Sequence, residues 1–423
     1  MAELTGNLLV AQSGGPTAVI NASVAGVVEQ SLQYPFIQNI YGGCNGILGI
    51  LNENLIDLKQ ELPETIQALK YTPAAALGTC RYKIDFKKEP KRAAREMDRL
   101  FQVLQAHNIR FFFYAGGNDS QDTSDKIHHE AIRRGFELRV IGIPKTIDND
   151  LPHTDHCPGF GSAAKYTAST VMEVAADVGS MATDDGSCCV IEVMGRSAGW
   201  IAASTVLAQR GPNDAPHVIL MPEFPFHEEP FLEKVKSVIA HIGYCVVVVG
   251  EGLKNPDGTE FSADKTRVDA FGHPVLSGAA DRLGELVFGR LRTRTRTVKL
   301  GCAQRCAAHF ASATDAAEAF ACGEAAVRAA AEGHSGFMVK LIRSPGDKYA
   351  WTTGLQPLGD IANVEHPVPR DWISQDGFMP NEKFIRYARP LIEGEVEVPT
   401  ESGLPKFAVL RRQIVPQKLP PRQ

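Results

Sequence analysis

The chain has 423 residues, with 44 Lys or Arg against 49 Asp or Glu, a formal net charge of -5, and 44% hydrophobic content. This length allows two domains with buried cores and excludes collagen-like, disordered and coiled-coil chains. The mild acidity argues against a protein that coats nucleic acid. The 38 glycines are more informative, because many follow apolar runs, where glycine lets the backbone approach a ligand.

The N-terminal segment has no basic leader, and polar and turn-forming residues from Gln12 to Pro16 interrupt its apolar stretch. It therefore predicts neither a signal peptide nor a membrane span. The 9 cysteines form no CxxC pair, and Cys188 and Cys189 are adjacent in an apolar run. This usage favours buried thiols in a reducing compartment. We expect a soluble, cytoplasmic protein with no membrane partner and no structural zinc.

The first predicted unit is a strand over residues 7–11, a turn at Gly14 and Gly15, and a helix that begins near Thr17. A helix is next predicted over residues 91–108, because its apolar residues recur at three-and-four spacing. The strands predicted after it cover residues 110–115, 139–143, 188–193, 218–221 and 245–249.

Each of these strands ends in a glycine turn or a polar cluster. Because the strands are apolar on both faces and alternate with helices, they predict an α/β fold with a largely parallel sheet covered on both sides. Ligands bind at the carboxyl ends of the strands in such sheets. The two halves of the chain could form two similar α/β lobes.

Two later stretches lack a clear period. Residues 254–277 contain several Pro and Gly residues and are predicted to be a long loop. The chain from Pro357 onward is predicted to be irregular, with a frayed tail after Val415.

Two glycine turns are candidate anion sites. Gly14 and Gly15 would aim backbone N–H groups at an anion, although an ordinary tight turn fits the same residues. Gly117 precedes Asn118 and Asp119, and the Asp119 carboxylate could hold magnesium. Both side chains also suit a helix N-cap, which is the interpretation we favour for this motif on its own.

The segment PKTIDND crowds a lysine, a hydroxyl and two carboxylates into one loop. Lys145 can neutralise a phosphoryl oxygen, while one of Asp148 and Asp150 can act as a general base and the other can hold a metal ion. Self-hydrogen-bonding turns are the alternative interpretation. The following HTDH segment lacks the helical spacing of a transition-metal site, so its histidines are interpreted as residues that orient the loop.

Cations and a carboxylate follow later strands. Arg196 opens a helix, where the macrodipole disfavours a cation, so a phosphate-binding role is favoured. Glu223 can accept hydrogen bonds from sugar hydroxyls or cap a helix. The run over residues 290–299 holds five cations; its start is interpreted as a solvated face, whereas Arg296, close to the glycine turn before Arg305, predicts a phosphate clamp.

Taken together, these motifs resemble the phosphofructokinase family. The segments SGGPTAVINA, LGTCR, GGNDS, PKTIDND, EVMGRSAGW, PE, GEG and LGCAQR occur in that family's order and approximate spacing, from Ser13 to Arg305. PKTIDND with MGRSAGW is a highly specific pair. The resemblance implies two Rossmann-like lobes with the active site in the cleft between them, phosphoryl transfer to the 1-hydroxyl of fructose 6-phosphate, and a homodimer or homotetramer.

The matching positions imply a role for each site residue, with Asp148 as the base that takes the proton from the sugar hydroxyl. The implied catalytic residues are Asp148, Lys145, Thr146 and Arg196. The implied donor-binding residues are Gly14, Gly15, Arg81, Gly117 and Asp119. The implied substrate-binding residues are Thr146, Ile147, Asp148, Met194, Gly195, Arg196, Glu223, Arg296, Cys302 and Arg305. The implied magnesium ligands are Asn118, Asp119 and Asp150.

The resemblance also implies a domain organisation. Residues 1–153 with about 306–360 would form the phosphoryl-donor lobe, and residues 154–305 would form the sugar-phosphate lobe. Residues 361–423 would be an irregular C-terminal extension.

Two positions indicate the donor. ATP-using members of the family place glycine where Asp119 and Lys145 stand, and this combination resembles pyrophosphate-dependent members. A carboxylate ~4 Å from a nucleotide α-phosphate would cost ~4 kcal/mol at an effective dielectric constant near ~20, or about a thousandfold in binding. Lys145 can stabilise the departing phosphate. We therefore predict pyrophosphate as donor, Mg²⁺ as cofactor, and a reversible reaction.

Three positions depart from the family pattern. Asn118 stands where a magnesium-binding aspartate is usual, Ser187 where many ATP-using members have an arginine, and Cys302 where histidine or tyrosine is expected. An ATP-dependent phosphofructokinase, sedoheptulose 7-phosphate as acceptor, and a non-catalytic sugar-phosphate-sensing paralogue therefore stay open. RNA binding through the arginine run would need interleaved aromatic residues, which the run lacks.

Overall fold

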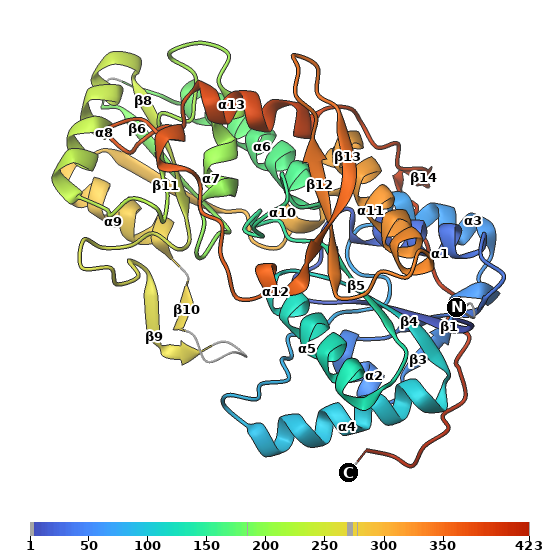
Figure 1. Cartoon of the computed structure of the whole chain (residues 1–423). Coiled ribbons are helices and arrows are strands. Elements are labelled where there is room, and N and C mark those ends of the chain that lie inside the picture. The colour runs from blue at the N-terminus through green and yellow to red at the C-terminus, as the bar shows by residue number, and fades with distance from the viewer. Residues whose placement is uncertain (1–3, 184, 269–273, 277, 423) are drawn as a thin grey trace.

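Two separate β-sheets organise the chain, as Figure 1 shows. The computed structural model describes residues 4–183, 185–268, 274–276 and 278–422. The larger sheet has seven strands, of which the two edge strands run antiparallel and the others are parallel. In spatial order they are β13 (Trp351–Pro357), β12 (Phe337–Arg343), β5 (Arg139–Pro144), β4 (Ile109–Gly116), β1 (Gly6–Gln12), β2 (Ile37–Gly43) and β3 (Leu55–Asp57).

The smaller sheet has four strands, all parallel. In spatial order they are β11 (Arg294–Lys299), β6 (Ser187–Val193), β8 (Tyr244–Gly250) and β7 (Val218–Leu220). Two short antiparallel pairs lie outside both sheets: β9 (Ala263–Val268) with β10 (Pro274–Leu276), and β14 (Thr400–Glu401) with β15 (Leu404–Pro405). The predicted α/β fold with largely parallel sheets is confirmed.

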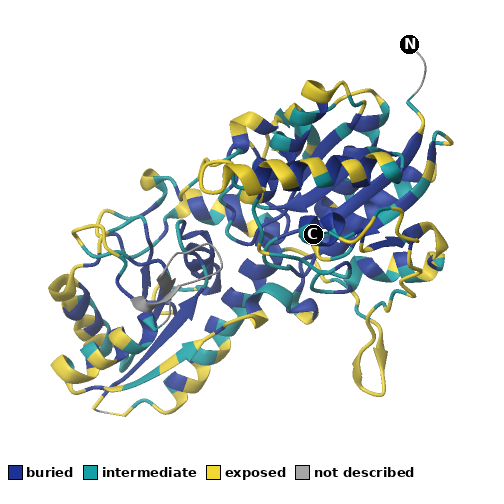
Figure 2. Ribbon diagram, turned by 90° about the horizontal axis from the view of Figure 1, so that it is seen from below, coloured by how far each residue is buried: buried dark blue, intermediate teal, exposed yellow. Residues whose placement is uncertain are grey.

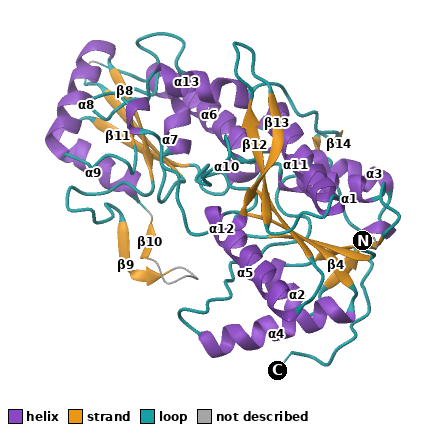
Figure 3. Cartoon of the chain, in the orientation of Figure 1, coloured by secondary structure: helices purple, strands orange, loops and turns teal. Residues whose placement is uncertain are grey.

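Helices lie on both faces of each sheet (Figure 3). Those of the larger sheet are α1 (Ile20–Ser31), α2 (Gly46–Leu51), α3 (Pro63–Ala68), α4 (Pro90–Ala106), α5 (Asn118–Arg134), α11 (Ala313–Ala331) and α12 (Leu358–Ile361). Those of the smaller sheet are α6 (Phe160–Ser180), α7 (Trp200–Ser204), α8 (Glu228–Ile242), α9 (Ala279–Leu291), α10 (Ala303–Cys306) and α13 (Glu382–Ala388). Short 3-10 helices are η1 (Leu58–Gln60), η2 (Leu69–Tyr71), η3 (Thr205–Ala208), η4 (Ala308–Phe310), η5 (Arg370–Trp372) and η6 (Arg389–Ile392).

The alternation of side chains along a strand explains why helices cover both faces. Leu8 and Val10 of β1 pack in one core with α1 and α11, whereas Leu9 and Ala11 pack in another with α2 and α4. Figure 2 shows the central strands of both sheets buried. Within the described ranges, no helix is long and apolar enough to span a bilayer.

One sequence prediction needs correction. Residues 254–277 are not simply a loop, because β9 and β10 pair within them; residues 269–273 and 277 lie outside the described residues. The arginine run spans two elements: Arg290 lies in α9 and pairs with Glu228 and Glu229, and β11 begins at Arg294. The solvated face predicted for the start of the run is confirmed for Arg290.

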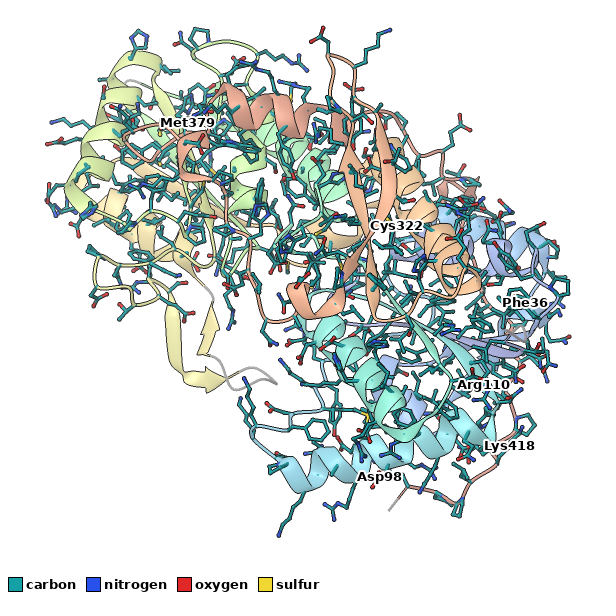
Figure 4. The ribbon with its side chains drawn as sticks, viewed as in Figure 1. Phe36, Asp98, Arg110, Cys322, Met379 and Lys418 are labelled. Carbon is teal, nitrogen blue, oxygen red and sulfur yellow. The ribbon has the colours of Figure 1, made fainter. Side chains whose placement is uncertain are left out.

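The prediction of a frayed tail after Val415 is wrong. The backbone N–H of Lys418 donates to Glu53 Oε2 at 2.8 Å, and that of Leu419 donates to Glu53 Oε1 at 3.2 Å. Lys418, labelled in Figure 4, also donates its Nζ to the backbone oxygen of Ala106 at the end of α4. A buried carboxylate that needs hydrogen-bond donors thus fixes the tail.

We expect deletion of residues 418–423 to destabilise the protein by about 3 kcal/mol, because Glu53 loses two donors to a buried charge. The urea midpoint of unfolding should fall relative to the full chain. Deletion of residues 421–423 is the matched control, because it retains both donors to Glu53. Equal midpoints for the two truncations would contradict this account of the tail.

Candidate active site

The ends of β1, β4 and β5 bring three predicted loops to one cleft of about 610 Å³. Its lining residues come mainly from these loops and from a segment near residue 81: Ser13, Gly14, Gly15, Cys80, Arg81, Tyr82, Gly117, Asn118, Asp119, Ser120, Lys145, Thr146, Asp148, Asp150, Asn363 and Glu365. The carboxyl ends of the larger sheet therefore build the cavity, as expected for a parallel α/β sheet.

A second cavity of about 360 Å³ adjoins the first and shares Gly15, Arg81, Lys145, Thr146 and Asp148 with it. Its other lining residues are Pro16, Ile147, Met194, Arg196, Glu251 and Arg305. Met194 and Arg196 follow β6 of the smaller sheet. The shared residues thus stand where the two lobes meet.

Lys145 lies at the junction of both cavities and is 3% exposed. Its Nζ donates to the backbone oxygen of Gly15 at 2.8 Å. Gly14 has a φ of +74°, and a Cβ there would lie 3.2 Å from Lys145 Nζ. Burial lowers the pKa of Lys145 to about 8, against the opposing charges of Asp148 and Asp150.

Three carboxylates share this region. Burial raises the pKa of Asp148, and Lys145 is the strongest of the cations that oppose the shift. Burial, the Asp148 charge and the Glu365 charge raise the pKa of Asp150 to about 7. Burial and the Asp148 charge likewise raise the pKa of Glu251 to about 7. Acids and bases whose pKa values are moved toward neutrality in a cleft are typical of proton transfer.

The loop that carries Asp148 is held by its own side chains and by its neighbours. Thr146 Oγ1 accepts the Asp148 backbone N–H at 3.1 Å, as in the predicted turns. Asn149 Oδ1 accepts the Cys157 N–H at 2.8 Å. His156 Nδ1 lies 2.8 Å from Asp155 Oδ2, and His156 Nε2 lies 2.6 Å from Glu318 Oε2. The predicted role of His156 in orienting the loop is therefore confirmed.

The first turn of α5 is arranged differently from the predicted metal site. Asn118 Oδ1 accepts the Asn363 N–H, and Asn118 Nδ2 donates to the backbone oxygen of Val364, both at 2.6 Å. Asp119 Oδ1 pairs with Lys83 Nζ at 2.7 Å. Asn118 therefore holds the segment after α12, and Asp119 is part of an ion pair. Within the part of the chain that the structure describes, no three His, Cys, Asp or Glu side chains converge as a metal site.

The residues predicted for the sugar phosphate are brought together only in part. Met194, Arg196 and Arg305 line the smaller cavity, but Arg296 and Cys302 do not. Arg296 donates instead to Met181 Sδ at 3.5 Å, and Cys302 is exposed. The smaller cavity is lined from α10, which holds Arg305, and not from β11, which holds Arg296.

Glu223 and Arg305 each keep a buried polar atom for a further partner. Glu223 Oε1 accepts the backbone N–H groups of Gly199 and Val368 at 2.8 and 3.0 Å, and burial raises its pKa. Glu223 Oε2 and Arg305 Nε have no hydrogen-bond partner among the described residues. Orphaned buried polar atoms are rare, and here they indicate atoms that a ligand would satisfy.

The structure places at or behind the cleft several residues that sequence reasoning did not assign to the site. Glu251 lines the smaller cavity, Asn363 and Glu365 line the larger one, Lys83 pairs with Asp119, and Tyr387 bonds to the loop residue Asn149. Lys83 lies two residues after the end of LGTCR and Glu251 lies in GEG, so their positions in or beside recognised motifs were a usable signal. The other three lie in a stretch without periodicity, which offered none.

Comparisons with known proteins agree with this arrangement. The sequence profile described as Phosphofructokinase matches residues 7–330. The pyrophosphate--fructose 6-phosphate 1-phosphotransferases of Halomonas elongata and Methylococcus capsulatus are each 45% identical to the chain, and each alignment covers 98% of both proteins. The crystal structure of the pyrophosphate-dependent phosphofructokinase from Nitrosospira multiformis superposes with a TM-score of 0.90, 43% identity and 99% coverage of both chains.

Proposed function

The chain belongs to the phosphofructokinase family, and we propose that it transfers a phosphoryl group reversibly from pyrophosphate to the 1-hydroxyl of fructose 6-phosphate. The observation that carries this proposal is a buried lysine that faces two carboxylates where the lobes meet. The full-length relatives named for this reaction support it.

Asp148 acts as the base for the sugar hydroxyl. It lines both cavities, so it faces a donor in the larger and an acceptor in the smaller. Its raised pKa makes its carboxylate a stronger base than a solvated aspartate. Thr146 holds the backbone of Asp148, which keeps the carboxylate oriented toward the acceptor.

Cations and backbone groups hold the phosphoryl groups. Gly14, Gly15 and Gly117 allow close approach of pyrophosphate, and Arg81 lines both cavities beside them. Lys145 and Arg196 balance the negative charge that is carried by the transferring group. Lys145 also stabilises the departing phosphate, which has no nucleoside through which it could be anchored.

The carboxylates of the larger cavity fit a magnesium ion. Burial first, and then the Asp148 charge, raise the pKa of Asp150, so a divalent cation beside Asp150 would favour its ionised form. Mg²⁺ usually binds through one or two carboxylates and substrate phosphates, so a complete protein cage is not needed. Asp150 would hold it, which leaves Asp148 free to act as the base, and when bound it would neutralise charge on the pyrophosphate oxygens.

The acceptor side uses the smaller lobe. We assign Met194, Gly195, Arg196 and Glu223 to the sugar, with the unpartnered Glu223 Oε2 as a hydroxyl acceptor. Arg305 supplies a cation for the sugar phosphate. Gly195, Glu223 and Arg296 do not line the smaller cavity themselves. Gly195 is assigned because it stands between Met194 and Arg196, and Arg296 stays a proposed ligand of the sugar phosphate because its Nη1 is buried without a partner among the described residues. Cys302 is exposed and is not assigned. The active species is proposed to be a homodimer or homotetramer.

The proposal is tested by assaying the purified chain with fructose 6-phosphate and Mg²⁺, comparing pyrophosphate with ATP. We expect turnover with pyrophosphate and a rate at least a hundredfold lower with ATP, since a difference near ~3 kcal/mol would give that ratio. Sedoheptulose 7-phosphate is the control for acceptor choice. Turnover with ATP alone would indicate an ATP-dependent enzyme, and turnover with neither donor would favour a sugar-phosphate sensor.

The Lys83–Asp119 ion pair refines the account of donor choice. Lys83 offsets part of the Asp119 charge, so the repulsion of a nucleotide is smaller than for a bare carboxylate. We expect Asp119→Gly to tighten ATP binding about tenfold, equivalent to ~1.4 kcal/mol, and Lys83→Met to weaken it by a similar factor. The measurement is the inhibition constant of ATP against pyrophosphate.

Lys88→Met is the matched control, because it removes an equal charge from the same segment without touching Asp119. Tighter ATP binding in both Asp119→Gly and Lys83→Met would overturn the electrostatic explanation. It would show instead that the pair obstructs the nucleotide sterically.

The shifted pKa values predict a bell-shaped pH dependence of kcat/KM for pyrophosphate. Below about pH 7 the Asp150 carboxylate becomes protonated, and above about pH 8 Lys145 loses its charge in the free enzyme. We therefore expect limbs near both values at low free Mg²⁺, and the acid limb should move to lower pH as free Mg²⁺ is raised, because the cation favours the ionised Asp150. Lys145→Met should lower the rate and abolish the alkaline limb. An alkaline limb that persists in this variant contradicts the assignment to Lys145.

A further inference from the structure

Asn149 stands between the two carboxylates of the catalytic loop and has an unusual backbone. It is 2% exposed and has a φ of +54°, in the left-handed region. A residue other than glycine pays conformational energy there, so its surroundings must hold it. Asn149 Oδ1 accepts the Cys157 N–H, and Asn149 Nδ2 donates to the Tyr387 hydroxyl, both at 2.8 Å. Both ends of this amide are therefore engaged.

The Tyr387 hydroxyl bonds to two residues of this loop. It accepts from Asn149 Nδ2 and donates to the backbone oxygen of Asp155 at 2.9 Å, so one oxygen joins two points of the same loop. Tyr387 lies in α13, more than two hundred residues later in the chain. Its ring packs at centroid distances of 5.4 Å from Trp200 and 5.1 Å from Trp372. The aromatic core of the smaller lobe thus fixes where the hydroxyl lies.

The far end of the loop is anchored in the larger lobe. Arg343 of β12 pairs with Asp155 at 2.9 Å, and His156 bonds to Asp155 and to Glu318. Glu318 lies in α11, one turn before Cys322, which Figure 4 labels. Burial lowers the pKa of His156, but Glu318 and Asp155 raise it by more, to about 9, so its cation is paired. Tyr387 therefore connects a segment fixed in one lobe to an aromatic core in the other.

We propose that Tyr387 is a positioning residue that aligns the base Asp148 with the acceptor side of the cleft, acting through Asn149. Tyr387 lines neither cavity of the active site. Asp148 follows a strand of the larger sheet, whereas Met194 and Arg196 follow a strand of the smaller one. The hydroxyl ties the base to the acceptor's lobe, and a misplacement near 1 Å costs about a hundredfold in rate. This inference rests on the proposed function.

Tyr387→Phe tests the proposal, because it removes one oxygen and retains the packed ring. We expect kcat with pyrophosphate and fructose 6-phosphate to fall between tenfold and a hundredfold, with both KM values within twofold of wild type. Tyr244→Phe is the matched control: Tyr244 packs against the same hydrophobic core as Tyr387, and no hydrogen bond within the described residues joins its hydroxyl to the catalytic loop. Its kcat should stay within twofold of wild type.

Hydrogen–deuterium exchange of the unliganded full chain gives a second readout that needs no activity. Peptides covering residues 145–157 should exchange about tenfold faster in Tyr387→Phe and at the wild-type rate in Tyr244→Phe. Unchanged exchange together with unchanged kcat overturns the proposal, as does a raised KM at constant kcat. If the wild-type chain shows no pyrophosphate activity, the proposed function fails, while the exchange experiment still decides whether Tyr387 holds the loop.

Discussion

The active site depends on the compensation of one buried ammonium group. Burial in the cleft removes water from the Lys145 ammonium group. A hydrogen bond to the Gly15 backbone oxygen and the negative charges of Asp148 and Asp150 partly compensate for that loss. The carboxylates depend on Lys145 in the same way, because burial alone would favour their neutral forms. The opposing effects leave Lys145 and Asp150 with pKa values close to neutrality. An arriving anion then favours the protonated lysine, so ligand binding and protonation are linked.

The glycine turn after β1 serves this cation as well as the ligand. A Cβ at Gly14 would lie 3.2 Å from Lys145 Nζ, and a Cβ at Gly15 would lie 3.2 Å from Arg305 Nη1. Side chains here would therefore crowd two cations from different lobes. The Gly14 φ of +74° adds a backbone reason for glycine at the first position. The sequence predicted that this glycine turn leaves space for a ligand. The structure shows that the side chains of Lys145 and Arg305 need the same space.

The sequence was enough to predict the features that local sequence determines, namely the strands and the loops at their ends. Apolar runs and the turns after them indicated the strands and the loops of Lys145 and Asp148, because parallel strands bring their carboxyl ends to one edge. Contacts across the whole chain were not predictable in this way. From the sequence, Asn118 was interpreted as a helix cap or a metal ligand. In the structure its side chain accepts the Asn363 N–H, from a residue far away in the chain. Arg296 is near Arg305 along the chain, but only Arg305 lines the smaller cavity, and spacing alone does not show this.

The segment after α12 joins the two lobes by hydrogen bonds. Three residues of the segment 363–368 form these hydrogen bonds. The Asn363 N–H donates to Asn118 Oδ1, the His366 N–H donates to the backbone oxygen of Asp150, and the Val368 N–H donates to Glu223 Oε1. The His366 oxygen accepts from Trp200 Nε1 in the smaller lobe. A few residues therefore join the donor loops of one lobe to the acceptor loops of the other.

Such built-in alignment suits a small donor. A nucleotide offers remote groups whose binding energy can orient the reacting phosphate, whereas pyrophosphate offers none beyond its own oxygens. Orientation must then come from the protein before the substrate arrives. The segment after α12, the Tyr387 hydroxyl and the buried Lys145 each fix part of the reacting geometry without a contact to a nucleoside. The bonds that join the two lobes around this cleft are thus what a donor without a nucleoside would require of the protein.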